Sequence, residues 1–158
     1  MGRRGCQSLR SRRAAARRYA GRPGAPGGKL AKILVIEDDL TFLDLVRVHL
    51  ASAGHEVVTA EDAALGLRAI IGEVPDIIIL DIFVPYLDGF ELLEALRNDP
   101  ATRPIPVIVL TGRGDDETYA RARKLGAADF FTKPVERDRL IKSIERLLAS
   151  RRTDPEAR

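Results

Sequence analysis

Polar side chains that could do chemistry follow four short apolar runs of this 158-residue sequence. They comprise three consecutive acids, a lone aspartate, a threonine, and a lysine that precedes a proline. These residues are Glu37, Asp38, Asp39, Asp81, Thr111 and Lys133. If the runs are parallel strands of one sheet, their carboxyl ends lie along one edge, and the polar groups converge there.

Clustered carboxylates repel one another, so one of them becomes protonated unless a cation compensates the charge. Mg²⁺ is the simplest such cation, because it accepts a few carboxylates together with water. The same ion could neutralise phosphoryl oxygens while a carboxylate attacks phosphorus. Thr111 could donate a hydrogen bond to one phosphoryl oxygen. Lys133 could pair with Asp81 at rest and with a second phosphoryl oxygen after the transfer. The set therefore indicates phosphoryl transfer.

Each of these residues also has an ordinary structural explanation. An acid after a strand often caps the next helix, as we expect of Asp39. A threonine there commonly bonds the backbone, and a lysine before proline is commonly solvated. Taken singly, the structural explanation is favoured each time, but the coincidence of all of them at one sheet edge favours the functional one.

Five runs rich in Ile and Val are short enough to be strands. They are Lys32–Ile36, Glu56–Thr59, Asp76–Leu80, Ile105–Leu110 and Asp129–Thr132. Segments with helical spacing separate them and follow the last, the first with Leu43, Val46 and Leu50 on one face. Gly54 and Gly126 stand where helix C-terminal glycines belong. The alternation predicts an α/β domain with a single five-stranded parallel sheet, doubly wound so that helices cover both faces.

The net charge of +3 conceals a split along the chain. Residues 1–30 carry eight arginines, Lys29 and no acid, whereas residues 31–158 hold 17 basic and 23 acidic side chains. The first 30 residues also lack a sustained apolar period. We therefore predict a disordered Arg-rich extension at 1–30, a folded domain at 31–150 and a short tail at 151–158.

Several function classes are disfavoured. No run approaches the ~20 apolar residues of a membrane span, and the basic start lacks the apolar stretch of a secretory signal. The only cysteine, Cys6, excludes a disulfide within the chain and favours a reducing, cytoplasmic setting. His49, a surface or boundary residue of the first helix, and His55, on the second strand, are too few for a zinc site. Phe83 stands where a haloacid-dehalogenase-type phosphatase has a second aspartate, and no Gly-rich nucleotide loop is present.

The sequence closely resembles the receiver domain of two-component response regulators, in its stand-alone, CheY-like form. The resemblance covers Ala31–Ser150 and rests on ILVIEDD, PDIIILDIFVPYLDGFELLEALR, PVIVLTG and KLGAADFFTKP, in the family's order and spacing. It implies the flavodoxin-like receiver fold, Asp81 as the phosphoacceptor, and a histidine kinase or histidine phosphotransfer protein as donor. It also implies a Mg²⁺ cofactor held by Asp38 directly, by Glu37 through water, by Asp81 and by the backbone carbonyl of Phe83.

The same resemblance assigns a switch. Thr111 matches the hydroxyl that turns toward the new phosphoryl group, and Phe130 matches the aromatic residue that then packs inward. Lys133 matches the family's lysine, with a cis bond to Pro134. Gly89 matches the turn after the acceptor strand.

Some positions depart from the commonest family pattern or tune its chemistry. Gly112 replaces the usual alanine and keeps the phosphoryl site open, and Val135 replaces phenylalanine after Pro134, a packing change. Phe83 and Arg113 occupy positions that set the phosphoryl lifetime in this family. Because Phe83 cannot orient water by a hydrogen bond, we expect slow spontaneous dephosphorylation.

The output is expected to be protein contact. The chain ends soon after the fifth predicted helix, without room for a DNA-binding module, and the resemblance implies signalling rather than enzymatic turnover. It places the contact on the face of the fourth helix, fifth strand and fifth helix. That face would include Tyr119, Arg123, Phe130, Arg137 and Arg139. The alternative is a constitutive binding module whose Arg-rich extension contacts nucleic acid, and dimerisation stays open.

Overall fold

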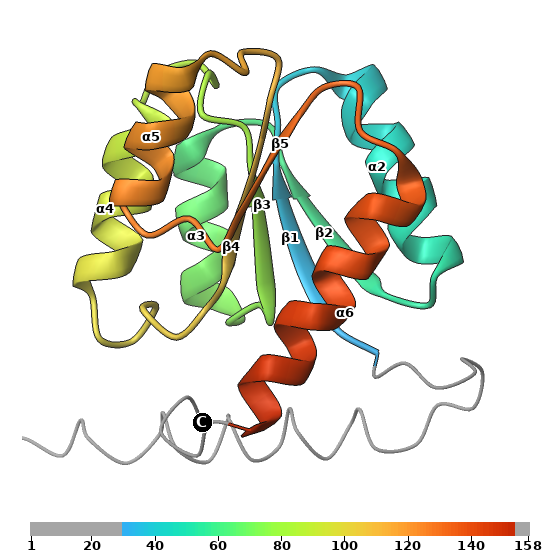
Figure 1. The fold of residues 1–158 in the computed structure, drawn as a ribbon. Coiled ribbons are helices and arrows are strands. Elements are labelled where there is room, and N and C mark those ends of the chain that lie inside the picture. The colour runs from blue at the N-terminus through green and yellow to red at the C-terminus, as the bar shows by residue number, and fades with distance from the viewer. Residues whose placement is uncertain (1–29, 154–158) are drawn as a thin grey trace, which may run out of the picture.

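Five parallel strands form the sheet of this computed structural model, which describes residues 30–153 (Figure 1). The strands are β1 (Lys32–Ile36), β2 (Glu56–Ala60), β3 (Ile77–Leu80), β4 (Val107–Thr111) and β5 (Asp129–Thr132). The helices are α2 (Leu40–Ser52), α3 (Ala63–Gly72), α4 (Gly89–Asn98), α5 (Asp116–Lys124) and α6 (Arg137–Thr153). The order across the sheet is β2-β1-β3-β4-β5, so the strand order reverses between β1 and β3. The predicted doubly wound α/β fold is confirmed. The predicted disordered extension, residues 1–30, lies outside the described residues except for Leu30.

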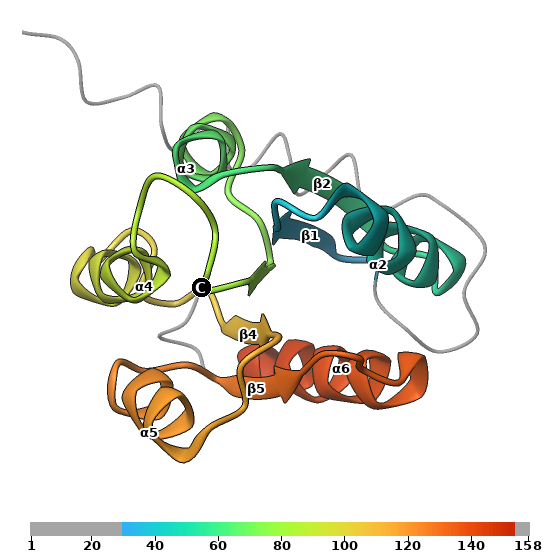
Figure 2. The same ribbon diagram turned by 90° about the horizontal axis from the view of Figure 1, so that it is seen from above.

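Strand residues alternate between two hydrophobic cores, because successive side chains of a strand point to opposite faces. In β1, Leu34 and Ile36 belong to one core, and Ile33 and Val35 to the other. Helices α3, α4 and α5 cover the first face, and α2 and α6 cover the second (Figure 2). Burial on both faces explains why the strands read as continuous apolar runs. Across residues 30–153, no helix is both long enough and apolar enough to cross a bilayer.

Local signals set where the helices begin and end. Asp39 caps α2 as predicted, and its Oδ1 accepts hydrogen bonds from the backbone N–H groups of Thr41 at 3.0 Å and Phe42 at 3.1 Å. A cap of this kind contributes about 1 kcal/mol. Gly54 and Gly126 follow α2 and α5 with φ values of 88° and 92°, a left-handed conformation that glycine adopts without strain. The predicted helix ends are therefore confirmed.

Element boundaries differ from the predicted ones where the backbone chemistry changes. β4 begins at Val107 rather than Ile105, because Pro106 has no N–H to donate to the ladder. The Pro106 carbonyl still accepts the Ile78 N–H at 3.0 Å. β4 extends through Thr111, β3 starts at Ile77, and β2 continues to Ala60. His55 lies just before β2 rather than within it.

Candidate functional site

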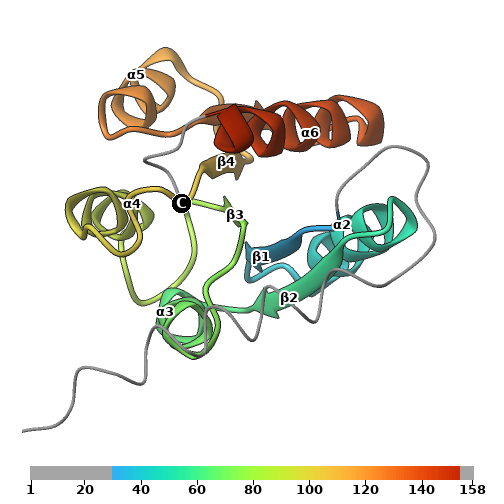
Figure 3. The same cartoon turned by 90° about the horizontal axis from the view of Figure 1, so that it is seen from below.

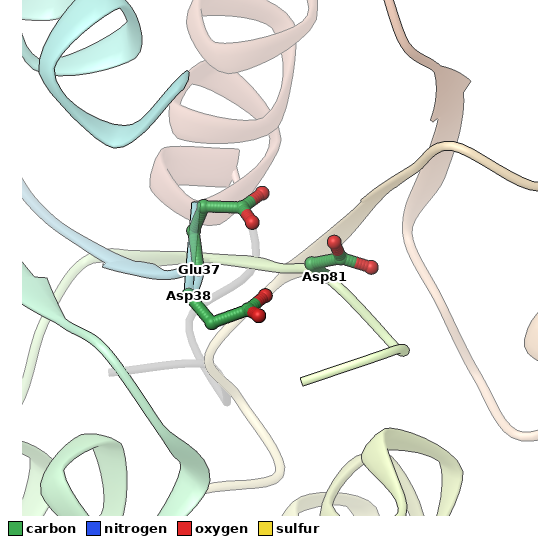
Figure 4. Close-up of side chains that lie close together, drawn as sticks. All are labelled: Glu37, Asp38 and Asp81. Atoms are coloured by element: carbon green, nitrogen blue, oxygen red, sulfur yellow. The ribbon is translucent and has the colours of Figure 1, made fainter. Parts of the chain in front are cut away.

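The acidic cluster forms where β1 and β3 end side by side. Ile36 pairs with Leu80 in the parallel register, so the next residues, Glu37 and Asp81, also become neighbours. The Asp81 N–H donates to the Ile36 carbonyl at 3.0 Å, which fixes the turn out of β3. Glu37, Asp38 and Asp81 each offer one carboxylate oxygen within 4.8 Å of the others (Figure 4). The predicted convergence at the carboxyl edge is thus present for all three acids.

Lys133 supplies the positive charge of the cluster. Its backbone N–H donates to the Thr111 carbonyl at 2.8 Å, so that β5 delivers the lysine next to the end of β4. The ammonium donates to Asp81 Oδ2 at 2.9 Å and to Glu37 Oε2, and lies 4.4 Å from the centre of the Phe42 ring. The predicted pairing with Asp81 is present, and so is the predicted cis peptide bond to Pro134. Sequence reasoning missed the bond to Glu37, although adjacent strands imply that a cation reaching Asp81 can also reach Glu37.

Burial controls the electrostatics of this cluster. Only 3% of the Glu37 side chain and 7% of the Asp81 side chain are exposed, whereas Asp38 is exposed. Burial raises the pKa of Glu37, although the hydrogen bond from Lys133 acts in the opposite direction. Burial alone would lower the pKa of Lys133, but its bonds to Glu37 and Asp81 outweigh that effect and raise it. The lysine is therefore held in its charged form between two nearly buried acids.

The mouth of the site is bordered by residues from two loops. Asp81 Oδ1 accepts the Phe83 N–H at 3.0 Å, so each Asp81 oxygen has one donor. The exposed Phe83 ring lies under the Arg113 guanidinium, whose carbon is 4.6 Å from the ring centre. This cation–π contact joins the loop after β3 to the loop after β4. Sequence reasoning had identified both residues, but not their contact with each other.

Thr111 and Phe130 lie on adjacent strands beside the cluster. Thr111 is fully buried, and its Oγ1 accepts the Arg113 N–H at 3.4 Å. Within the described part of the chain, Thr111 makes no hydrogen bond to Asp81, so it is close to the cluster but not joined to it. Phe130 is half-buried and meets Tyr119 edge-to-face, with ring centres 5.4 Å apart.

The residues predicted for the contact face lie on α5, β5 and α6, and one of them, Arg137, points away from the others. Tyr119, Arg123 and Arg139 are exposed on α5 and α6. Arg137 belongs elsewhere, because its guanidinium donates to Ser52 Oγ at the end of α2. A helix turns about 100° per residue, so positions 137 and 139 point in nearly opposite directions.

Arg146, which was not predicted for this face, lies on the side of α6 next to β5. Its guanidinium donates to Asp129 Oδ2 at 2.7 Å. The sequence spacing could have indicated this position, because Arg146 lies seven residues after Arg139 and therefore on the same side of α6.

The donor set fits the predicted Mg²⁺. Hard oxygen donors from Glu37, Asp38 and Asp81 lie close together, and Lys133 neutralises only one of the three negative charges. Small divalent cations prefer carboxylate oxygens together with water. The contribution of the Phe83 carbonyl stays a prediction.

Comparisons with known proteins identify the family of this chain. A family model for the response regulator receiver domain matches residues 33–145. The chain is 34% identical over 120 residues to protein PilH of Pseudomonas aeruginosa, covering 76% of this chain and 99% of PilH. It is 37% identical over 125 residues to the DNA-binding dual master transcriptional regulator RpaA of Synechocystis, covering 79% of this chain and 51% of RpaA. The crystal structure of a response regulator receiver domain protein from Methanospirillum hungatei matches with a TM-score of 0.73 at 30% identity, covering 78% of this chain and 97% of that one.

The chain belongs to the response regulator receiver domain family, as the resemblance had indicated. It spans about half the length of relatives such as RpaA and nearly all of PilH. The family thus includes relatives that consist of little more than this domain and others that are about twice its length.

Proposed function

We propose that this chain is a single-domain response regulator that accepts a phosphoryl group on Asp81, with Mg²⁺, and signals through protein contact. The observation that carries the proposal is the bridge from Lys133 to both Asp81 and Glu37 within a cluster of three carboxylates. The donor is a phosphohistidine of a sensor histidine kinase or of a histidine phosphotransfer protein. The chain acts as a phosphoryl acceptor rather than as an enzyme, over the domain 31–150, in the cytoplasm.

The acceptor step uses Asp81 as the nucleophile. One carboxylate oxygen forms a bond to phosphorus as the bond from phosphorus to the donor imidazole nitrogen breaks, and the imidazole leaves with the electron pair. The product is an acyl phosphate on Asp81. Lys133 holds the carboxylate in place beforehand and can afterwards pair with a phosphoryl oxygen. Mg²⁺ held by Glu37, Asp38 and Asp81 would neutralise the charge on the phosphoryl oxygens.

The switch step involves groups at the ends of β4 and β5. The Thr111 hydroxyl oxygen accepts the Arg113 N–H at 3.4 Å, and its own O–H proton can still be donated to a phosphoryl oxygen. Movement of Thr111 would free space for Phe130, whose ring packs against Tyr119 on α5. Repacking of these two rings would alter the α5–β5–α6 face, where a downstream protein or a second copy binds.

Intact-mass spectrometry after incubation with Mg²⁺ and acetyl phosphate tests the proposal. The wild type should gain a single phosphoryl adduct, which Asp81→Asn abolishes and a chelator prevents. Asp116→Asn, which replaces an exposed aspartate of α5, serves as the matched control and should be modified like the wild type. Absence of any adduct, under conditions that modify another receiver domain, would overturn the acceptor role.

A further inference from the structure

Charge is distributed unevenly over residues 30–153, which hold 21 acidic and 16 basic side chains. Residues 54–76, with β2 and α3, carry five acids and one base, whereas residues 113–153, with α5, β5 and α6, carry seven acids and eleven bases. The two regions lie on opposite sides of the domain (Figures 2 and 3). We call residues 54–76 the β2–α3 surface. Its acids are Glu56, Glu61, Asp62, Glu73 and Asp76.

A hollow of about 280 Å³ opens between α3 and the amino ends of the neighbouring strands. Its lining includes Lys32, Leu34, Val58, Ala69, Glu73 and Pro75. The wall is largely apolar, and the Lys32 ammonium is bonded to Glu73 and lies 4.0 Å from Glu56. About half of each of these two acidic side chains remains exposed, at 52% and 48%. The exposed part of Glu73 can therefore accept a second cation, while the wall suits an aliphatic stem.

A strongly basic segment directly precedes the described domain in the sequence. Residues 1–29 contain eight arginines and Lys29, and no acid. They join the described domain at Leu30, and Lys32, the first residue of β1, lines the hollow. An extended chain spans about 3.3 Å per residue, so the nearest arginine, Arg22, can reach the β2–α3 surface without difficulty.

We propose that the Arg-rich segment 1–29 docks in cis on the β2–α3 surface, with an arginine side chain entering the hollow. Its guanidinium would pair with Glu73, and its aliphatic stem would cover the apolar wall. The basic side of the domain, formed by α5 and α6, repels the same segment. Two acids of the phosphoryl site, Glu37 and Asp81, lie at the opposite ends of the strands and already have Lys133 as a partner. Docking on the β2–α3 surface leaves both the acceptor site and the α5–β5–α6 face open to other proteins.

Cys6 makes the proposal directly testable, because it is the only cysteine and lies within the segment. A nitroxide label on Cys6 of the full chain broadens the amide resonances of residues that it approaches. At low salt, the largest losses of intensity should fall in residues 54–76. They should diminish as salt rises to ~0.5 M, where the screening length shrinks to about 4 Å.

Charge variants of the labelled full chain assign the contact. Glu61→Gln combined with Glu73→Gln should restore intensity in residues 54–76. The matched control, Glu117→Gln with Glu136→Gln, neutralises two exposed acids of the basic side and should leave the broadening unchanged. The salt series on the wild type does not depend on how well any variant folds.

Three outcomes would overturn the proposal. Broadening centred on residues 37–39 and 81–83 would place the segment at the acceptor site. Broadening that is independent of salt would exclude a charge-based contact. In a third outcome, the label causes no loss of intensity in residues 54–76 of the free protein, and intensity is lost only in resonances that shift with an added DNA duplex. That result would show that nucleic acid is the partner.

Discussion

Replacing Lys133 with methionine removes the one cation that joins the two nearly buried acids of the phosphoryl site. The change keeps most of the side-chain volume and leaves Glu37, Asp38 and Asp81 within 4.8 Å of one another. At that separation and an effective dielectric constant of about 20, two unit charges repel by roughly 3.5 kcal/mol. Loss of one partner of a buried pair typically costs about 3–5 kcal/mol. Because a carboxyl can take up a proton, we expect a loss near the lower end, about 3 kcal/mol.

Urea unfolding followed by circular dichroism, with chelator present, measures this loss as a change in the free energy of unfolding. The variant's deficit should grow as pH rises above about 4.3, the unfolded pKa of glutamate, because removing Lys133 raises the Glu37 pKa in the folded state still further. Mg²⁺ at about 10 mM should recover roughly 2 kcal/mol, if it binds the folded state with a dissociation constant near 0.4 mM.

Lys142→Met is the matched control, since it removes one exposed positive charge of α6 without touching the cluster. It should change the free energy of unfolding by less than about 0.5 kcal/mol. A Lys133→Met deficit as small as that of the control would refute the reasoning. So would a deficit that Mg²⁺ leaves unchanged, because the cluster would then not be the source of the cost.

Three further changes probe other parts of the domain. Gly89→Ala places a Cβ 2.5 Å from the backbone of Ile82 in the acceptor loop. It should lower the free energy of unfolding by about 1–3 kcal/mol in thermal melts. Gly112→Ala, whose Cβ would have nothing within 4 Å, should be neutral. Burial lowers the pKa of His55, although Glu145 and Asp76 act in the opposite direction. The free energy of unfolding should therefore fall as pH drops below about 6.5, where only the unfolded state binds the proton. This fall should be absent in His55→Gln and retained in His49→Gln. The amide introduced by Phe83→Asn can orient a water molecule, so the substitution should shorten the lifetime of the phosphoryl adduct roughly tenfold, as measured by mass spectrometry. An unchanged lifetime would contradict the expectation that Phe83 slows dephosphorylation.

The sequence was informative wherever one local rule determines the outcome. The Ile-rich runs became central strands because a strand buried on both faces must be apolar throughout. Asp39 became a cap because its side chain is short and directly precedes a helix. Glu37 and Asp81 met because parallel strands end at one edge, which follows from topology without any knowledge of side-chain positions.

The sequence was less informative where the result depends on how elements pack against each other. The strand order places Glu37 beside Asp81, but it does not give the distance between β1 and the loop after β5 that decides whether Lys133 bonds both acids. The positions of Arg137 and Arg146 depend on the rotation of α6 relative to β5 and α2. The hollow beside α3 likewise arises from packing, because its apolar residues are ordinary core types.

Two lysines at opposite ends of the sheet show why burial, rather than residue type, assigns the chemistry. Lys32 bridges Glu56 and Glu73 at the amino end, and Lys133 bridges Glu37 and Asp81 at the carboxyl end. The first two acids are about half exposed, so water solvates their charge and the pairs contribute little. The second two are nearly buried and have Asp38 beside them, so their charge must be compensated by a cation or a proton. The carboxyl end therefore has the stronger demand for positive charge, which is the demand that the proposed Mg²⁺ ion would meet.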